Sequence, residues 1–152
     1  MGVRSNCLKP YLMKRILFIL SLLLAMQVSA QVEIIIGDTT STQTSSKLPL
    51  SVDYRYSYTQ SVYQRSELVA GEISSISYYF TSESLSAGTI SIYMKETSDS
   101  VLNGFSSSEG FVQVFSGALN LTNGWTTFVF PEIFEYSGQN NLVVAVVKSD
   151  NS

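Results

Sequence analysis

The stretch from Gly124 to Val147 constrains the fold of this chain more strongly than any other part of the sequence. Residues 125–130 combine β-branched and aromatic side chains, which favour a strand. Pro131 lacks a backbone N–H and is expected to end that strand. Turn-forming residues at 137–141 precede an unbroken apolar run at 142–147, which indicates a strand buried on both faces. We therefore expect a hairpin at the core of a β-sandwich, with three structural anchors: Trp125, Phe134 and Tyr136.

The rest of the sequence after residue 30 contains further short strand patterns separated by Gly, Asn and Ser turns. Alternation over 89–94 places Ile90, Ile92 and Met94 on one face of a strand. Further strands are expected at residues 32–36, 54–63, 73–80 and 111–115. No segment after residue 30 has a helical period. The pattern predicts an all-β chain folded as an antiparallel, jelly-roll-like β-sandwich of about seven or eight strands.

One long polar segment, residues 95–110, interrupts the succession of strands. It is expected to hold a short helix or an excursion from the sheet. Its apolar residues Val101, Leu102 and Phe105 are expected to tuck against the sandwich, because burying them removes apolar surface from water.

The first 30 residues have the pattern of a signal peptide. A short basic segment at 13–15 precedes an apolar run at 16–26, and small residues at 28–30 fit a cleavage site. The alternative, a transmembrane anchor, needs a longer apolar run. We expect residues 1–30 to be removed, with Met13 as an alternative start, leaving a single β-sandwich domain at 31–152 that is secreted or held at the cell surface. Because the last apolar run lies so near Ser152, we expect the chain to be truncated there.

Removal of residues 1–30 changes the charge of the chain. Five basic residues then remain against the 12 acidic ones, which gives a formal charge of −7. Such a domain should repel nucleic acid and anionic membrane surfaces, so neither nucleic-acid binding nor membrane insertion is expected of it.

The composition also excludes several kinds of catalysis. The chain has no His, and its single Cys, Cys7, leaves with the signal peptide, so Ser-His-Asp and Cys-His mechanisms and Cys/His zinc sites cannot be built. No phosphate-binding glycine motif is present, and no cofactor is expected. A carboxylate-dependent glycosidase is the one enzyme class left open, although solvated surface charge is the interpretation we favour for its candidate carboxylates: Asp53, Glu67, Glu132 and Glu135.

Tyr54, Tyr56 and Tyr58 form the most unusual pattern in the chain. Alternation over the strand expected at 54–63 places the three rings on one face. They could form a core or scaffold face, which the pattern favours, or a platform that binds a sugar or a peptide.

Calcium is a further candidate ligand of the loops. Carboxylates at Asp38 and Asp53 lie in or beside loops, where oxygen ligands could hold a structural ion. No Asp-x-Asp spacing supports this site.

Several landmarks resemble a module of secreted multidomain surface proteins of the Bacteroidetes. They include residues 48–50, 58–63, 71–76, 114–117 and, most closely, the aromatic and apolar positions of 124–146. The resemblance spans nearly all of 33–152 and implies a β-sandwich found beside fibronectin type III domains, peptidases or C-terminal secretion-sorting domains. It offers no catalytic residues. Two short motifs also resemble O-glycosylation signals of that phylum, with acceptors at Thr39 and Ser100.

Two functions follow as expectations. The first is a non-catalytic extracellular module for adhesion, for carbohydrate or protein binding, or for spacing other domains of a longer parent protein. The alternative is an accessory domain of a secreted peptidase or glycosidase whose catalytic domain is absent from this chain.

Overall fold

A computed structural model of the chain describes residues 31–36, 48–51, 53–81 and 88–149. The chain divides into two units, 1–35 and 36–152, and all strands belong to the second. The strand expected at 32–36 is wrong, since residues 31–36 have no regular structure. A strand is stable only when a neighbour satisfies its backbone groups. The predicted signal peptide, residues 1–30, lies outside the described residues.

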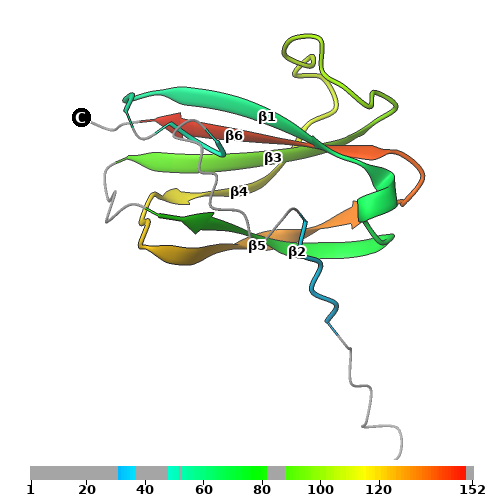
Figure 1. Cartoon of the computed structure of the whole chain (residues 1–152), viewed down its shortest axis with the longest axis horizontal. Coiled ribbons are helices and arrows are strands. Elements are labelled where there is room, and N and C mark those ends of the chain that lie inside the picture. Colours follow the sequence, from blue (N-terminus) through cyan, green and yellow to red (C-terminus); the bar gives the residue numbers. More distant parts are fainter. Residues whose placement is uncertain (1–30, 37–47, 52, 82–87, 150–152) are drawn as a thin grey trace, which may run out of the picture. The chain divides into compact units, whose positions relative to one another are not determined.

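The described part of the second unit is an antiparallel β-sandwich of six strands, which confirms the all-β prediction with fewer strands than expected. One 3₁₀ helix, η1 (Arg65–Glu67), follows the first strand. The strands are β1 (Ser57–Tyr63), β2 (Gly71–Phe80), β3 (Thr89–Thr97), β4 (Val112–Ala118), β5 (Gly124–Tyr136) and β6 (Asn141–Ser149). They form a four-stranded sheet, β1-β6-β3-β4, and a two-stranded sheet, β2-β5, which lie one above the other in Figure 1.

Strand β6 lies inside the four-stranded sheet, between β1 and β3. Its residues from Leu142 to Val146 are all buried, which confirms the prediction from the apolar run. Leu142, Val144 and Val146 contribute to the hydrophobic core. Val143 and Ala145 alternate with them and so lie on the opposite face of the sheet. The continuous run therefore reflects a strand that is covered on both faces.

Strand β5 pairs with β2 and runs through Pro131 to Tyr136. The prediction that Pro131 ends the strand is wrong. The pairing shifts register there: Val129 lies opposite Ser75, but Phe134 lies opposite Ile73. Four residues of β5 therefore face a single residue of β2, and this bulge needs no ladder bond from the proline nitrogen.

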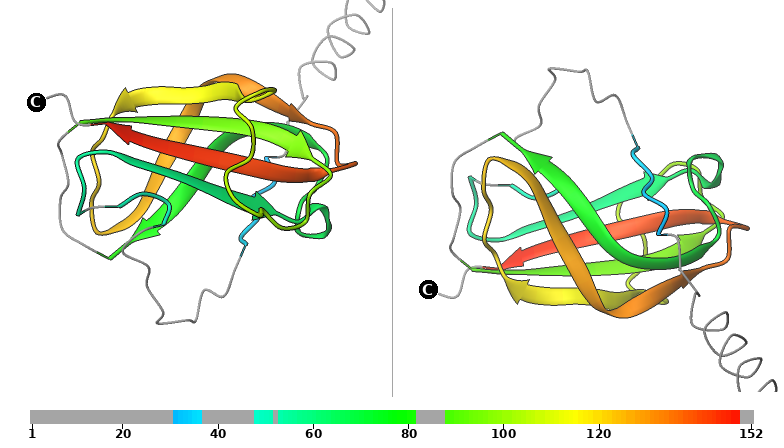
Figure 2. Two further views of the ribbon diagram at one scale, coloured as in Figure 1. Left: turned by 90° about the horizontal axis from the view of Figure 1, so that it is seen from above. Right: turned by 90° about the horizontal axis from the view of Figure 1, so that it is seen from below.

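The predicted hairpin of β5 and β6 is also wrong. The two strands are consecutive, but β5 belongs to the two-stranded sheet and β6 to the four-stranded one. The turn between them carries the chain from one layer to the other (Figure 2). Their apolar side chains still meet, because both strands face the same interior.

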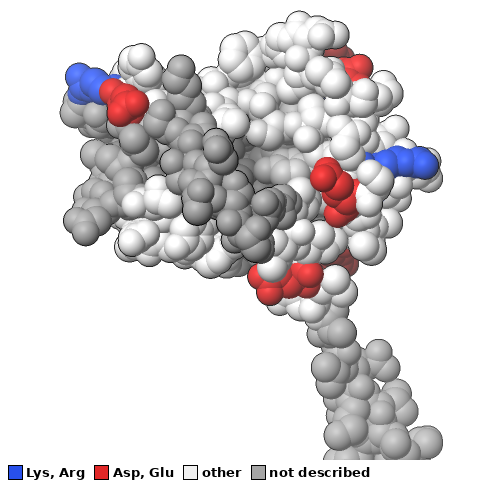
Figure 3. Space-filling model, in the orientation of Figure 1, with Lys and Arg blue, Asp and Glu red and all other residues white. Residues whose placement is uncertain are grey.

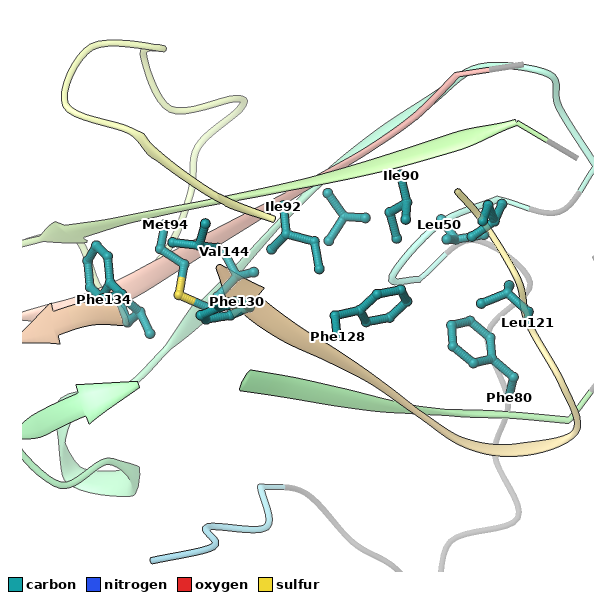
Figure 4. Packing of buried hydrophobic residues seen from close by; sticks show 14 of the residues in the cluster. Leu50, Phe80, Ile90, Ile92, Met94, Leu121, Phe128, Phe130, Phe134 and Val144 are labelled. Carbon is teal, nitrogen blue, oxygen red and sulfur yellow. The ribbon is translucent and has the colours of Figure 1, made fainter. Parts of the chain in front are cut away.

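The interior between the sheets is filled by aliphatic and aromatic side chains (Figure 4). Ile90, Ile92 and Met94 are buried on the inner face of β3, as the alternation predicted. Phe128 packs edge-on against Phe115 of β4, with ring centroids 5.3 Å apart. Leu50 is buried too, which confirms that the chain re-enters the core before β1.

Two tyrosines join the two sheets by a hydrogen bond between their hydroxyls: Tyr63 of β1 and Tyr78 of β2. Both are partly buried against the core. Burial raises the pKa of both phenols, and that of Tyr78 lies well above its ordinary value of 10.0. The pair is therefore a neutral polar link within a mostly apolar interior.

Candidate functional site

The three tyrosines singled out by the sequence lie at the surface. Tyr54 and Tyr56 are each 65 % exposed, and Tyr58 is 40 % exposed. The prediction that all three share one strand face is wrong, because β1 begins at Ser57 and residues 53–56 form bends before it. A core position is wrong for Tyr54 and Tyr56, since rings with this exposure contribute little to a packed interior. Tyr58 is more covered, and its hydroxyl accepts a hydrogen bond from Gln60, so a scaffold role stays a prediction for it.

A fourth aromatic ring, from a distant part of the chain, contacts one of the three. Phe105, in the β3–β4 loop, lies against Tyr58 with ring centroids 5.0 Å apart and planes inclined by 40°. Phe105 is 71 % exposed, so this contact leaves most of its ring in solvent. We refer to these four exposed rings as the tyrosine surface: Tyr54, Tyr56, Tyr58 and Phe105.

Hydrogen bonds fix the loop that carries Phe105 over the four-stranded sheet. The side chain of Gln60 accepts a hydrogen bond from the Ser106 amide at 2.7 Å and donates one to the Ser106 carbonyl at 3.3 Å. Lys95 donates to the carbonyls of Ser107 and Glu109, and its ammonium lies 4.5 Å from the centre of the Phe111 ring. Figure 2 shows the loop crossing the outside of this sheet.

The same loop explains how the outer face of β6 is covered. Ala145 is paired with Gln60 of β1 and with Tyr93 of β3, and Gln60 in turn holds the loop. The loop has no helix, and the prediction that its apolar residues tuck against the sandwich is wrong for Val101 and Phe105, which are exposed, whereas Leu102 is half-buried. Hydrogen bonds from side chains to the loop backbone help to hold the loop in place.

Lys148 anchors the segment that carries Tyr54 and Tyr56. It lies on β6 and is only 6 % exposed. Its ammonium donates hydrogen bonds to the carbonyls of Ser51 and Tyr54, at 3.3 and 2.8 Å. A buried ammonium group needs such acceptors, because moving it out of water without a hydrogen-bond partner costs free energy. The contacts tie the backbone beneath Tyr54 to the central strand of the sheet.

The three predicted anchors divide into two groups. Phe134 and Tyr136 are buried, which confirms the prediction for them. Trp125 is not buried, because it lies on the outer face of the narrow two-stranded sheet and is 58 % exposed. Its only described ring contact is with Tyr79, which is equally exposed, at 5.5 Å between centroids and 77° between planes.

Tyr136 helps to close the turn between β5 and β6. Its hydroxyl donates to the Asn140 carbonyl at 2.6 Å, and its pKa is raised by burial and by the nearby Glu96 carboxylate. Glu96 accepts hydrogen bonds from the Ser137 amide and hydroxyl and from the Asn140 side chain. Partial desolvation raises the pKa of Glu96, but these donors outweigh it and hold the pKa below its ordinary 4.5.

The candidate catalytic carboxylates belong to several elements of the fold. Glu67 accepts a bond from the Gln64 amide at 3.0 Å and so closes the start of η1. Asp53 precedes β1 whereas Glu67 follows it, so a strand about 20 Å long separates them. Glu132 and Glu135 are exposed on β5. A carboxylate-dependent glycosidase, which requires an opposed pair of carboxyl groups, stays a prediction.

Other predicted sites fall partly outside the described residues. Asp38 and Thr39 lie outside them. Asp53 is exposed, and no group of three His, Cys, Asp or Glu side chains in the described part could hold a metal ion. Ser100 is exposed in the β3–β4 loop, where a glycan could attach, while its carbonyl accepts a bond from Gln64. Calcium and glycosylation stay predictions.

The sequence pointed to the three tyrosines but not to the residues that contact or support them. Phe105 belongs to the polar loop and is 47 positions from Tyr58, so no local pattern links the two rings. Lys148 gave one signal, since it continues the alternation of β6 onto the buried face. Tyr79 occupies an outward position of β2. Its position could have been predicted from the alternation, because its neighbours Tyr78 and Phe80 point inward.

Comparison with models of protein families, with curated proteins and with solved structures finds no match to this chain. Among the described residues, no helix has the length and apolar character needed to cross a membrane.

Proposed function

We propose that this chain is a non-catalytic, extracellular binding module that uses the tyrosine surface to hold a carbohydrate ligand. The observation that carries the proposal is the exposure of four aromatic rings at and beside β1: Tyr54 and Tyr56 just before the strand, Tyr58 on it, and Phe105 in contact with Tyr58. Exposed rings cost free energy in water, and tyrosine offers both an apolar ring and a hydroxyl to a ligand.

The chemistry of the surface favours a sugar. The apolar C–H face of a pyranose can stack on a ring, while its hydroxyls exchange hydrogen bonds with phenols and amides. Gln60 donates to the Tyr58 hydroxyl, which keeps that phenol oriented beside the Phe105 ring. Figure 3 shows, on the face it draws, charged side chains scattered among described residues that are mostly uncharged.

Preorganisation supports the same proposal. The Tyr54 backbone is bound by Lys148, and the Phe105 loop is bound through Gln60 and Lys95. A surface fixed in this way loses little conformational entropy when it binds, so more of the contact energy appears as affinity.

The resemblance to Bacteroidetes surface modules motivates the remaining parts of the proposal. The module would act in adhesion, or in spacing the other domains of a longer secreted or surface protein. As the alternative, the same surface would attach a secreted hydrolase to its substrate.

A glycan array tests the proposal. The wild-type protein is compared with a variant carrying Tyr54→Ala, Tyr56→Ala and Tyr58→Ala, and with a control variant, Val101→Ala, which alters another exposed side chain of the loop that carries Phe105. We expect the wild type and the control to bind a common set of glycans and the triple variant to lose them. Unchanged unfolding by circular dichroism must accompany the loss. The proposal fails if the wild type binds no glycan, or if the folded triple variant binds as well.

A further inference from the structure

A second aromatic surface lies on the opposite side of the sandwich, on the outer face of the β2–β5 sheet (Figure 2, right). Tyr79 and Trp125 are paired across the two strands and are both 58 % exposed. Their planes are inclined by 77°, so the two rings present differently oriented apolar faces to solvent. This pair is unrelated to the tyrosine surface, which belongs to the other sheet.

Residues with hydroxyl groups lie next to this aromatic pair along the two strands. The next outward pair is Ser77 and Thr127, whose hydroxyls are 2.8 Å apart. Each hydroxyl has one proton and two lone pairs, so this pair keeps capacity for further hydrogen bonds. The following pair is Ser75 and Val129. We call the six residues of these three pairs the tryptophan surface: Tyr79, Trp125, Ser77, Thr127, Ser75 and Val129.

Charged side chains on these two strands lie at the bulge and beyond it, where Glu132, Glu72 and Glu135 are all exposed. None of the six residues of the tryptophan surface is Asp, Glu, Lys or Arg, whereas Glu72 and Glu135 lie directly opposite each other farther along the same two strands. Two exposed carboxylates at one end repel anions. A neutral ligand is therefore favoured over a sulfated or uronic-acid glycan.

The dimensions favour a chain-like ligand over a protein. From the Tyr79 pair to the Val129 pair the surface is about 13 Å long, and two strands make it about 10 Å wide. That is about 130 Å² in plan, far below the roughly 800 Å² per partner of a stable protein interface. A narrow row of two rings followed by hydroxyls matches an oligosaccharide that lies along the strands.

We infer that the tryptophan surface is a second binding site, whose ligand is a neutral oligosaccharide that stacks on Trp125 and Tyr79 and hydrogen-bonds to Ser77 and Thr127. The inference does not depend on the tyrosine surface. If both sites hold the same polysaccharide, the module would engage it on two opposite faces and so could cross-link chains.

Trp125 makes the test specific, because it is the only tryptophan in the chain. Its emission is recorded while cellohexaose, xylohexaose, mannohexaose or chitohexaose is added, with an oligogalacturonide as the anionic control. We expect a saturable change with at least one neutral hexaose and none with the anionic one. Tyr79→Ala keeps the reporter and should weaken binding by about tenfold or more, as expected when an aromatic contact residue is truncated.

Two controls separate this site from the other. The variant lacking the Tyr54, Tyr56 and Tyr58 rings should show the same sugar-induced change in Trp125 emission as the wild type. Binding at the tryptophan surface can therefore be measured even if the tyrosine surface binds no ligand. Acrylamide should quench Trp125 readily in the free protein at every protein concentration. The inference is overturned if no neutral hexaose alters the emission, if Tyr79→Ala leaves affinity unchanged, or if Trp125 is shielded before any sugar is added, as it would be beneath a second copy or another segment.

Discussion

Gly138, in the turn between β5 and β6, is the position where a single methyl group should disturb the sandwich most clearly. Its φ is +72°, a left-handed conformation that L side chains rarely adopt. A Cβ added there would lie 2.6 Å from the Cβ of Ala70 and 3.3 Å from its Cα. Gly138→Ala therefore imposes both backbone strain and a steric clash on a turn that links the two sheets.

The magnitude follows from these two contributions. A left-handed conformation costs a non-glycine residue about 1–2 kcal/mol. Forcing a methyl group into occupied space costs about 1–3 kcal/mol more, since Ala70 and the turn must move apart. We therefore expect Gly138→Ala to lower the free energy of unfolding by about 2–5 kcal/mol.

Gly110 offers a matched control. Its φ is +78°, close to that of Gly138, but a Cβ there would meet nothing within 4 Å. Gly110→Ala should thus cost only the backbone part, about 1–2 kcal/mol. The difference between the two variants isolates the contact with Ala70.

Urea unfolding of the two variants measures this difference directly. Adding Ala70→Gly to Gly138→Ala should restore the steric part of the loss, and the double-mutant cycle should give a coupling energy of about 1–3 kcal/mol. Equal losses in Gly138→Ala and Gly110→Ala, or no recovery on adding Ala70→Gly, would show that contact with Ala70 does not destabilise the Gly138→Ala variant.

Three further predictions concern polar groups that hold the sandwich together. Lys148→Met leaves the Ser51 and Tyr54 carbonyls without their ammonium donor, so urea unfolding should show a loss of about 1–3 kcal/mol; an unchanged midpoint would show that the lysine does not hold this segment. Because the pKa of Glu96 is lowered in the folded protein, its ionised carboxylate stabilises the fold above about pH 4.5, and this stabilisation is lost as pH falls through the folded-state pKa. Glu96→Gln should therefore narrow the stability gap between pH 7 and pH 3, and an unaltered pH profile would contradict this. The pKa of Tyr78 is raised in the folded protein, so its pH dependence is the reverse. Its neutral phenol stabilises the fold fully below about pH 10, and the free energy of unfolding falls above that pH by up to about 1.4 kcal/mol per pH unit. Tyr78→Phe should flatten that alkaline fall, and an equally steep fall in the variant would count against the buried hydroxyl pair.

The sequence was informative where local alternation and burial coincide. Ile90, Ile92 and Met94 lie inside as their spacing predicts, because β3 pairs on both edges and buries one face completely. The unbroken run of β6 correctly indicated a strand covered on both sides. Alternation is a property of each strand alone, so it is visible without knowledge of the partners.

Pairing between strands was not visible in the same way. Strands β5 and β6 are close in sequence and end at a good turn, which favours a hairpin, but the turn instead crosses between layers. The exposure of Trp125 has a related cause. It depends on the sheet being only two strands wide in the described part and on its outer face lying open, and neither is encoded within residues 125–130.

The candidate site shows the same division. The Tyr54–Tyr58 pattern located the aromatic surface, but its exposure depends on where β1 begins, and its fourth ring comes from a loop fixed by Gln60 and Lys95. Such contacts join residues far apart in sequence, and a single sequence carries no local signal for them.

Calorimetric titration with the glycan that binds most strongly on the array measures whether the tyrosine surface is the binding site. We predict that the variant lacking the Tyr54, Tyr56 and Tyr58 rings binds this glycan at least about tenfold more weakly than the wild type, and that Phe105→Ala also weakens binding. If the glycan binds through rings and hydroxyls, affinity should change little with salt. Equal affinity of the wild type and the folded triple variant would rule out the tyrosine surface as the binding site.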